Sequence, residues 1–302
     1  MPLFRPLMVA VLLSGACMLE PDALLPPVPP GHALAYVSGG VFNNGDIFVL
    51  SGDGSSDQNV TQSAAFDFWP AWSPDGTQLA FESDRDEVIA TEIYVLTLGT
   101  GAITRLTTDS GFADAQPAWS PLGDRIAFVS NRDSAGFDIY LMSPTGGSVR
   151  RLTTDSGDSV HPAWSPAGDR IAFASDSGGG GRIDIYVMDT LGGNVVNLTH
   201  DDATDLAPAW SPDGQKIAFH SDRDSVGFAV WVMDADGTNA VRVSPSSPGC
   251  ELADWTPDGL RLAFDCDRDI WVANADGSGL TRITRTTSQQ RIELMPRWKP
   301  VP

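Results

Sequence analysis

Short apolar runs separated by turn residues follow one another along the chain from His32 to its end. Val, Ile, Phe, Tyr and Trp dominate the runs, as in Ile217-Ala218-Phe219, and Gly, Pro, Ser and Asp fill the gaps between them. Runs of this length and composition are typical of β-strands, and the gaps have the composition of turns. Because helical periodicity is absent after Gly31, the pattern predicts an all-β fold.

One phrase that contains a tryptophan recurs six times at nearly constant spacing. The successive intervals are 47, 45, 46, 45 and 43 residues, and a period near 45 is typical of propeller blades or of a solenoid. A typical copy, such as the one around Trp210, contains a Pro-Ala-Trp strand, a Ser-Pro-x-Gly turn, an Ile-Ala-Phe strand and a second hairpin, which gives four strands, A to D, per repeat. The tryptophans are Trp72, Trp119, Trp164, Trp210, Trp255 and Trp298.

The two ends of the chain each carry part of one repeat. The first repeat, residues 34–61, has sequences for strands B, C and D, and the missing strand A stands at the far end as Pro296-Arg297-Trp298. A solenoid needs capping repeats rather than a split repeat, so this arrangement favours a closed ring. We therefore predict a six-bladed β-propeller over residues 32–302, built from four-stranded antiparallel blades and closed by the C-terminal strand joining the N-terminal blade.

The repeated motifs Trp-Ser-Pro-x-Gly, Ile-Ala-Phe, Ser-Asp-Arg-Asp and Asp-Ile-Tyr-Val-Met resemble the six-bladed propeller repeats of the TolB family of bacterial periplasmic proteins. The resemblance extends over nearly all of the chain from His32 onward. It implies a propeller of the bacterial cell envelope. TolB itself has an N-terminal α/β domain for which this chain has no room, and it is not lipid-anchored, so the resemblance leaves a Tol partnership open.

The first 31 residues are predicted to be a secretion signal followed by a tether. Arg5, the apolar run 7–13 and the small residues 14–16 fit a signal peptide of residues 1–16. Cys17 follows directly in a run that resembles a bacterial lipobox, with Ser14 where Leu is usual, and plain secretory cleavage is the alternative. The segment 17–31 contains five prolines and favours an extended spacer. We expect a periplasm-facing or surface lipoprotein that contacts the membrane only through its anchor.

Charge and hydropathy exclude two kinds of protein. The chain has 39 acidic and 19 basic residues and a formal net charge of −20, which repels phosphate backbones, so no nucleic-acid partner is expected. No run of about 18 apolar residues is present, which argues against a polytopic membrane protein.

The register of each A–B hairpin places the same two positions opposite each other in every repeat. With Ser-Pro-x-Gly as the turn, Asp205 faces Ser221, and in the fifth repeat the same two positions are Cys250 and Cys266. Cross-strand Cβ atoms lie about 4.5–5.5 Å apart, which is near disulfide reach. We predict a Cys250–Cys266 disulfide in an oxidising compartment, with two free thiols as the alternative.

Chain direction brings the D–A and B–C connections to the same end of the ring, where acidic and basic residues gather in the sequence. We predict a net-acidic mouth of the channel that would suit a basic partner surface. No cofactor is expected, although Asp67, Asp114 and Asp205 are weak candidates for Ca²⁺ ligands, and hydrogen bonding of each Asp within its own turn is the simpler interpretation. The candidate residues are Asp67, Asp114, His161, Asp205, Glu293, Arg85, Arg132, Arg223 and Arg268.

Motifs of the common hydrolases and nucleotide-binding enzymes are absent from the sequence. His161 departs from the repeat, because sister repeats have Trp69, Gln116 and Ala207 at that position. Nearly even repetition favours a scaffold, so we predict a monomeric, non-enzymatic propeller that binds an envelope protein or peptide at its acidic mouth. The alternatives are a hydrolase or lyase with an acidic site there, with or without a metal, and a surface protein whose mouth binds nothing tightly.

Overall fold

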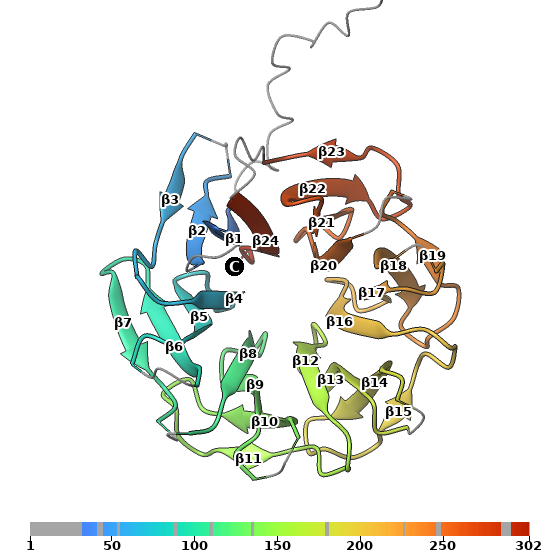
Figure 1. Cartoon of the computed structure of the whole chain (residues 1–302), viewed down its shortest axis with the longest axis horizontal. Helices are drawn as coiled ribbons and strands as arrows, with labels where there is room; N and C mark the ends of the chain where they lie inside the picture. Colours follow the sequence, from blue (N-terminus) through green and yellow to red (C-terminus); the bar gives the residue numbers. More distant parts are fainter. Residues whose placement is uncertain are drawn as a thin grey trace, which may run out of the picture.

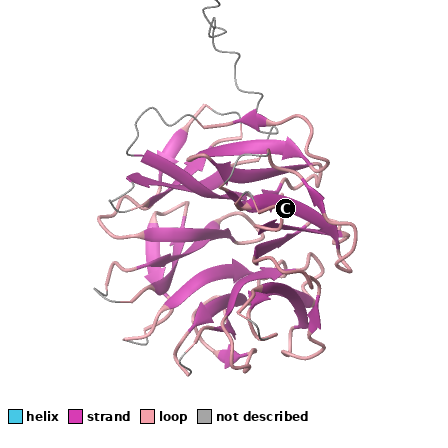
Figure 2. Cartoon of the chain, turned by 45° about the vertical axis from the view of Figure 1, so that its right-hand side comes forward, coloured by secondary structure: helices cyan, strands magenta, loops and turns pink. Residues whose placement is uncertain are grey.

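The computed structural model shows six four-stranded antiparallel sheets arranged as the blades of a ring (Figure 1). It describes residues 32–40, 45–52, 55–86, 90–108, 111–133, 136–178, 181–225, 227–245, 249–284 and 291–301. Within these ranges Figure 2 shows strands and loops only, and no helix is long and apolar enough to cross a membrane. The predicted signal peptide 1–16, Cys17 and the tether 17–31 lie outside the described residues.

Five blades are formed by consecutive strands, each with its first strand beside the channel. The first two are β4 (Asp67–Trp72), β5 (Gln78–Ser83), β6 (Glu92–Thr97) and β7 (Ala102–Arg105), and β8 (Asp114–Trp119), β9 (Ile126–Ser130), β10 (Asp138–Met142) and β11 (Arg150–Arg151). The next two are β12 (Ser159–Trp164), β13 (Arg170–Ser175), β14 (Asp184–Asp189) and β15 (Val196–Asn197), and β16 (Asp205–Trp210), β17 (Lys216–Ser221), β18 (Ala229–Asp234) and β19 (Val241–Arg242). The fifth is β20 (Cys250–Trp255), β21 (Arg261–Cys266), β22 (Asp269–Asn274) and β23 (Thr281–Arg282).

The sixth blade joins the two ends of the chain, which confirms the predicted closure. Its order is β24 (Arg291–Trp298), β1 (Leu34–Gly40), β2 (Asp46–Leu50) and β3 (Asp57–Asn59). Leu34 lies opposite Trp298, and Ser38 lies opposite Glu293. The C-terminal strand is thus the innermost strand of a blade that otherwise comes from the N-terminal end of the propeller.

The core of the ring lies between neighbouring blades. Phe128 and Tyr140 of one blade pack in one cluster with Ile93 of the blade before it, and similar clusters recur around the described part of the ring. The tryptophans that mark the repeat add a hydrogen bond, because the indole N–H of Trp164 donates to the carbonyl of Ala118 in the preceding blade at 3.1 Å. The repeated aromatic residues therefore hold adjacent blades together.

A β-bulge interrupts every innermost strand at the same place. In β4 the register shifts between Phe68 and Ala71, and the residue within the shift, Trp69, has a φ of 53°. The equivalent residues, with φ from 48° to 57°, are Gln116, His161, Ala207, Leu252 and Met295. A bulge leaves a backbone N–H outside the ladder and re-aims the side chain, so this ring of residues shapes the interior of the channel.

The register predicted for the A–B hairpins is confirmed, and so is the disulfide. Asp205 lies opposite Ser221, and Cys250 lies opposite Cys266 with the two Sγ atoms bonded. Both cysteines are buried. The bridge ties β20 to β21 at the start of one hairpin.

Replacing Cys266 with Ser is expected to lower the free energy of unfolding by about 3 kcal/mol, because the bridge restricts the unfolded chain over 16 residues. Urea unfolding with and without reductant measures the effect. The midpoint of the wild type should fall in reductant, whereas that of the Cys266→Ser variant should not move. The prediction would be contradicted if the urea midpoint of the wild type were the same with and without reductant and if both thiols could be alkylated in the native protein.

Candidate functional site

The predicted mouth residues form buried ion pairs at one end of the ring. Asp67, Asp114 and Asp205 are each 0% exposed. Arg85 donates to Asp67 at 2.8 Å, Arg132 to Asp114 at 2.7 Å, and Arg223 to Asp205 at 3.0 Å. Each arginine also lies over the ring of a Phe on its own strand B. These six groups neutralise one another inside the blades, so their carboxylates are not open to a partner.

One blade lacks both partners of this ion pair. In the β12–β15 blade, Ser159 stands where three other blades have Asp67, Asp114 or Asp205, and Ser177, 18 residues later, stands where those blades have Arg. The Ser159 hydroxyl instead donates to Ser175 at 3.2 Å. In this blade a pair of hydroxyl groups therefore takes the place of the ion pair in the hairpin.

The other predicted mouth residues have different surroundings. Glu293 is 5% exposed, and its N–H donates to the carbonyl of Arg268 at 3.1 Å, whereas the Arg268 side chain itself is exposed in the short turn between β21 and β22. Exposed acids at this end include Asp86, Asp133 and Asp267, and also Asp201 and Asp202, which lie beside a cavity of about 400 Å³ that Arg223 also lines. Among the described residues, no group of three or more His, Cys, Asp or Glu side chains could hold a metal ion.

Sequence reasoning missed a second set of ion pairs where strand C begins. Arg105 donates to Glu92 at 2.6 Å, and Arg151 donates to Asp138 at 2.6 Å, with both acids buried. These pairs join strand D to strand C of one blade. In the sequence, the acid and the arginine of each pair are 13 residues apart, and this fixed spacing could have revealed them.

Polar side chains of the channel interior bind the amides that the bulges leave free. The Glu82 carboxylate accepts a hydrogen bond from the backbone N–H of Gln116 at 2.8 Å. The side-chain amide oxygen of Gln116 accepts one from the backbone N–H of His161 at 2.7 Å. His220 Nδ1 accepts from the N–H of Leu252 at 3.3 Å. Each bond joins one blade to the next, so these departures from the repeat have a structural reason.

Burial changes the protonation of these groups. It raises the pKa of Glu82 to about 7 and, with Glu251 nearby, that of Asp265 to about 8. It lowers the pKa of His161 and of His220 to about 3, so both imidazoles are neutral at physiological pH. In the described part of the chain neither imidazole hydrogen-bonds a hydroxyl or carboxylate, so neither has the partner that activates a nucleophile.

The middle of the channel is closed by side chains. The ring of Trp69 contacts that of His161 from a non-adjacent blade in a tilted arrangement, with 4.9 Å between centroids. Ala207, Leu252 and Met295 pack together in a cluster that Trp69 also contacts. His161 was expected near the acidic mouth, but it lies at this closure and faces the opposite end of the ring.

A pocket of about 330 Å³ opens between this closure and the A–B turns. Its walls are mainly Pro, Ala and Trp from the innermost strands, and its rim includes Pro74, Pro121, Pro166 and Pro300. A mostly apolar concavity with a few polar groups is the usual form of a binding site. It lies at the end of the channel away from the predicted mouth.

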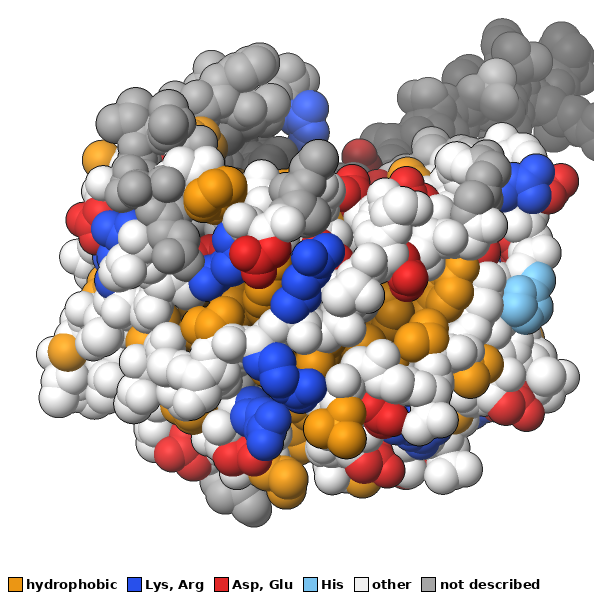
Figure 3. All heavy atoms as spheres, turned by 90° about the horizontal axis from the view of Figure 1, so that it is seen from below, with side chains coloured by type: hydrophobic (Ala, Val, Ile, Leu, Met, Phe, Trp, Pro, Cys, Tyr) orange, Lys and Arg blue, Asp and Glu red, His pale blue; other side chains and the backbone are white. Residues whose placement is uncertain are grey.

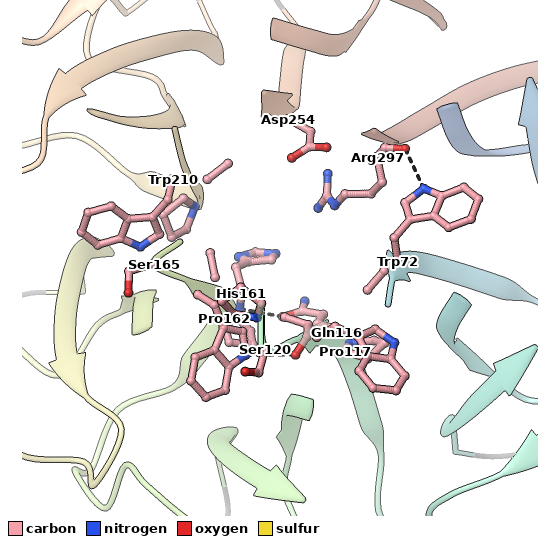
Figure 4. Close-up of a pocket in the computed structure, with 18 of the residues that line it drawn as sticks. Trp72, Gln116, Pro117, Ser120, His161, Pro162, Ser165, Trp210, Asp254 and Arg297 are labelled. Atoms are coloured by element: carbon pink, nitrogen blue, oxygen red, sulfur yellow. Dashed lines mark hydrogen bonds between the residues drawn. The ribbon is translucent and has the colours of Figure 1, made fainter. Parts of the chain in front are cut away.

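At one position of the repeat, the pocket wall has two charged residues in place of alanine. Four strands have Ala71, Ala118, Ala163 or Ala209 there, whereas β20 has Asp254 and β24 has Arg297. Figure 4 shows these two side chains on adjacent innermost strands, pointing toward each other on one side of the pocket, with His161 and Gln116 on the facing wall. Aligning the Pro-Ala-Trp phrases residue by residue would have revealed both substitutions, because the other four repeats have Ala.

Charge elsewhere on the surface is mixed. On the side of the ring in Figure 3, basic side chains stand beside acidic ones, and hydrophobic groups lie between them. The net charge of −20 therefore does not appear as a uniform acidic surface on that side. The pocket is the place where apolar walls and isolated charges meet.

Similarities to known proteins agree with the ring of six blades. Residues 156–265 match the family described as the TolB beta propeller domain. Over these residues the chain is similar to the TolB beta propeller domain. The Protein TolB homolog of Chlorobium luteolum (strain DSM 273 / BCRC 81028 / 2530) is 41% identical over 56 residues, which are 18% of this chain and only 12% of that protein.

Two solved structures have a fold similar to that of this chain. TolB from Acinetobacter baumannii superposes with a TM-score of 0.77 at 25% identity, over 92% of this chain and 68% of that one. An oligogalacturonate lyase from Vibrio parahaemolyticus has a TM-score of 0.57 at 14% identity, over 82% of this chain and 73% of that one. The second likeness concerns the fold alone.

Proposed function

We propose that this TolB-type propeller is a non-enzymatic binding module of the bacterial cell envelope, anchored through Cys17, that takes a segment of a protein partner into the channel pocket. The observation that carries the proposal is the broken symmetry of the pocket wall, where Asp254 and Arg297 replace alanine. A scaffold without a ligand has no need for two charges inside an apolar channel, where each is costly to bury.

The resemblance to TolB supports the envelope location, and the buried ion pairs favour the pocket end over the predicted acidic mouth as the docking end. An enzyme finds less support, because both buried histidines lack an activating partner in the described residues and the lyase likeness extends only to the fold. The proposal therefore moves the docking site to the other end of the channel and keeps the kind of function that the sequence predicted.

A photo-crosslinking amino acid at two exposed leucines at the pocket end tests the proposal. Leu122 is 68% exposed, next to the rim residue Pro121, whereas Leu191 is 76% exposed in the turn between the outer strands β14 and β15. Irradiation of native cells should link position 122, but not position 191, to an envelope protein. Filling the pocket with Ala163→Trp should remove that product. Identical products from both positions, or none from position 122, would argue against a channel-binding module.

A further inference from the structure

The pocket contains a partly buried arginine with few protein partners. Arg297 Nη1 donates to the carbonyl of Pro296 at 2.8 Å, and its Cζ lies 6.0 Å from the centre of the Trp69 ring. In the described part of the chain, Arg297 forms no ion pair within 4.0 Å, although Asp254 and Asp265 act on it electrostatically. A guanidinium has five N–H donors, so most of those of Arg297 remain available to a ligand.

The nearest acid is already occupied. Asp254 Oδ2 accepts from the N–H of Trp298 at 2.7 Å, which holds the carboxylate against the strand of the neighbouring blade. Burial raises the pKa of Asp254 and lowers the pKa of Arg297, so neither charge is fully compensated by the other. Arg297 thus remains an electropositive group in an apolar pocket.

The facing wall adds donors. The carbonyl oxygen of Gln116 accepts from the N–H of His161, which leaves the amide group of Gln116 as a donor in the pocket. His161 Nδ1 is buried and has no hydrogen-bond partner among the described residues. Proline and alanine rather than further acids surround these groups, so the complementary ligand group is an anion with two acceptor oxygens.

The depth of the pocket limits which kind of anionic group can reach Arg297. Arg297 lies three residues from the rim residue Pro300, which is about 10 Å at the rise of a strand. An acidic side chain extends only about 5 Å from its Cα. The floor is closed by Trp69 and His161, so a chain cannot pass through, whereas the end of an extended chain can enter.

We propose that the pocket recognises the C-terminal carboxylate of an extended peptide, bound by Arg297 with the Gln116 amide beside it. This inference rests on the proposed function and specifies the chemistry of its partner. Arg suits the role because its planar fork matches the two oxygens of a carboxylate.

Three capped alanine tripeptides test the inference. One has a free C-terminal carboxylate, one a C-terminal amide, and one a C-terminal amide with a central glutamate. Binding is followed on the full propeller by the NMR signals of the indole N–H groups, which include Trp69 and Trp72 in the pocket, at constant ionic strength. We expect the free carboxylate to bind at least tenfold more tightly than either amide.

Two variants with opposite effects distinguish recognition from folding. Arg297→Gln should reduce the affinity for the free carboxylate to that for the amide, whereas Asp254→Asn should increase it, because it removes a competing negative charge and keeps the oxygen that accepts from Trp298. Arg182→Gln, in the connection between β13 and β14 with a side chain 49% exposed and outside the pocket lining, is the matched control and should change nothing.

Equal binding of carboxylate and amide would overturn the carboxylate inference and leave the proposed binding module in place. Tightest binding of the central glutamate would overturn it too, in favour of an acidic side chain as the ligand. If no peptide shifts any pocket indole, the inference fails, while cross-linking at position 122 independently decides the proposed function. An unchanged carboxylate preference in Asp254→Asn and Arg297→Gln would assign both residues a purely structural role.

Discussion

Removal of residues 285–302 is expected to abolish cooperative unfolding of the propeller. The deletion takes away β24, which pairs with β1 from Leu34 to Gly40 and is the innermost strand of its blade. Trp298 packs with Leu34 and Tyr36, and Met295 belongs to the closure of the channel, with both side chains less than 10% exposed. Loss of one buried Trp costs about 3–5 kcal/mol. A whole strand therefore costs more than the roughly 5–15 kcal/mol that stabilises a typical domain.

Near-UV circular dichroism during urea unfolding measures this effect. Trp298→Ala is the control, and it should shift the midpoint while the transition stays cooperative. A synthetic peptide of residues 285–302 added to the truncated chain should restore the signal, because it supplies the missing strand. If the truncated chain unfolds cooperatively near the wild-type midpoint, closure by β24 is not what holds the ring together.

The repeat made the fold predictable. Each blade must bury the same faces against its neighbours, so the strands repeat the same residue types, and the turn residues fix the register. This is why the sequence alone predicts the pairing of Asp205 with Ser221 and the Cys250–Cys266 bridge. The positions that a propeller constrains most are the ones that a sequence reveals best.

The candidate site was harder to predict, for two physical reasons. Whether a carboxylate faces solvent or pairs with an arginine depends on the conformation of the loop that follows its hairpin. Asp67 and Arg85 are 18 residues apart, and this spacing indicates an ion pair only once both residues are known to belong to the same hairpin. The bulge residues share a backbone conformation but no side-chain type, since Trp69, His161 and Leu252 all adopt it. No local pattern therefore predicted which side chains close the channel, or that the pocket lies at the other end.

Replacing Arg223 with Met is expected to lower the free energy of unfolding by about 3–5 kcal/mol at neutral pH, because the Asp205 carboxylate stays buried without its ion-pair partner. Arg223 binds both oxygens of Asp205, at 3.0 and 3.1 Å, and also the Ser221 hydroxyl at 2.9 Å. Methionine keeps much of the apolar stem that lies over Phe219 and Trp231. The loss should therefore come mainly from the unpaired charge.

The pKa of Asp205 determines in which direction the stability of the Arg223→Met variant changes with pH. Burial already raises the pKa of Asp205 above its usual 3.8 despite Arg223, and removing the arginine should raise it further. The folded variant then holds a proton that the unfolded chain releases, so its stability falls as pH rises through the folded-state pKa and recovers in acid. The melting-temperature difference from wild type should be largest at pH 7 and smallest near about pH 4.

Two further variants separate a buried pair from a surface effect. Arg125→Met removes the partner of an exposed acid, Asp124, and should change stability by about 1 kcal/mol or less. The double variant Asp205→Asn, Arg223→Met should regain much of the loss, because it leaves no buried charge. If Arg223→Met matches Arg125→Met at every pH, the buried pair of Arg223 with Asp205 adds no more to the stability of the folded protein than an exposed ion pair does.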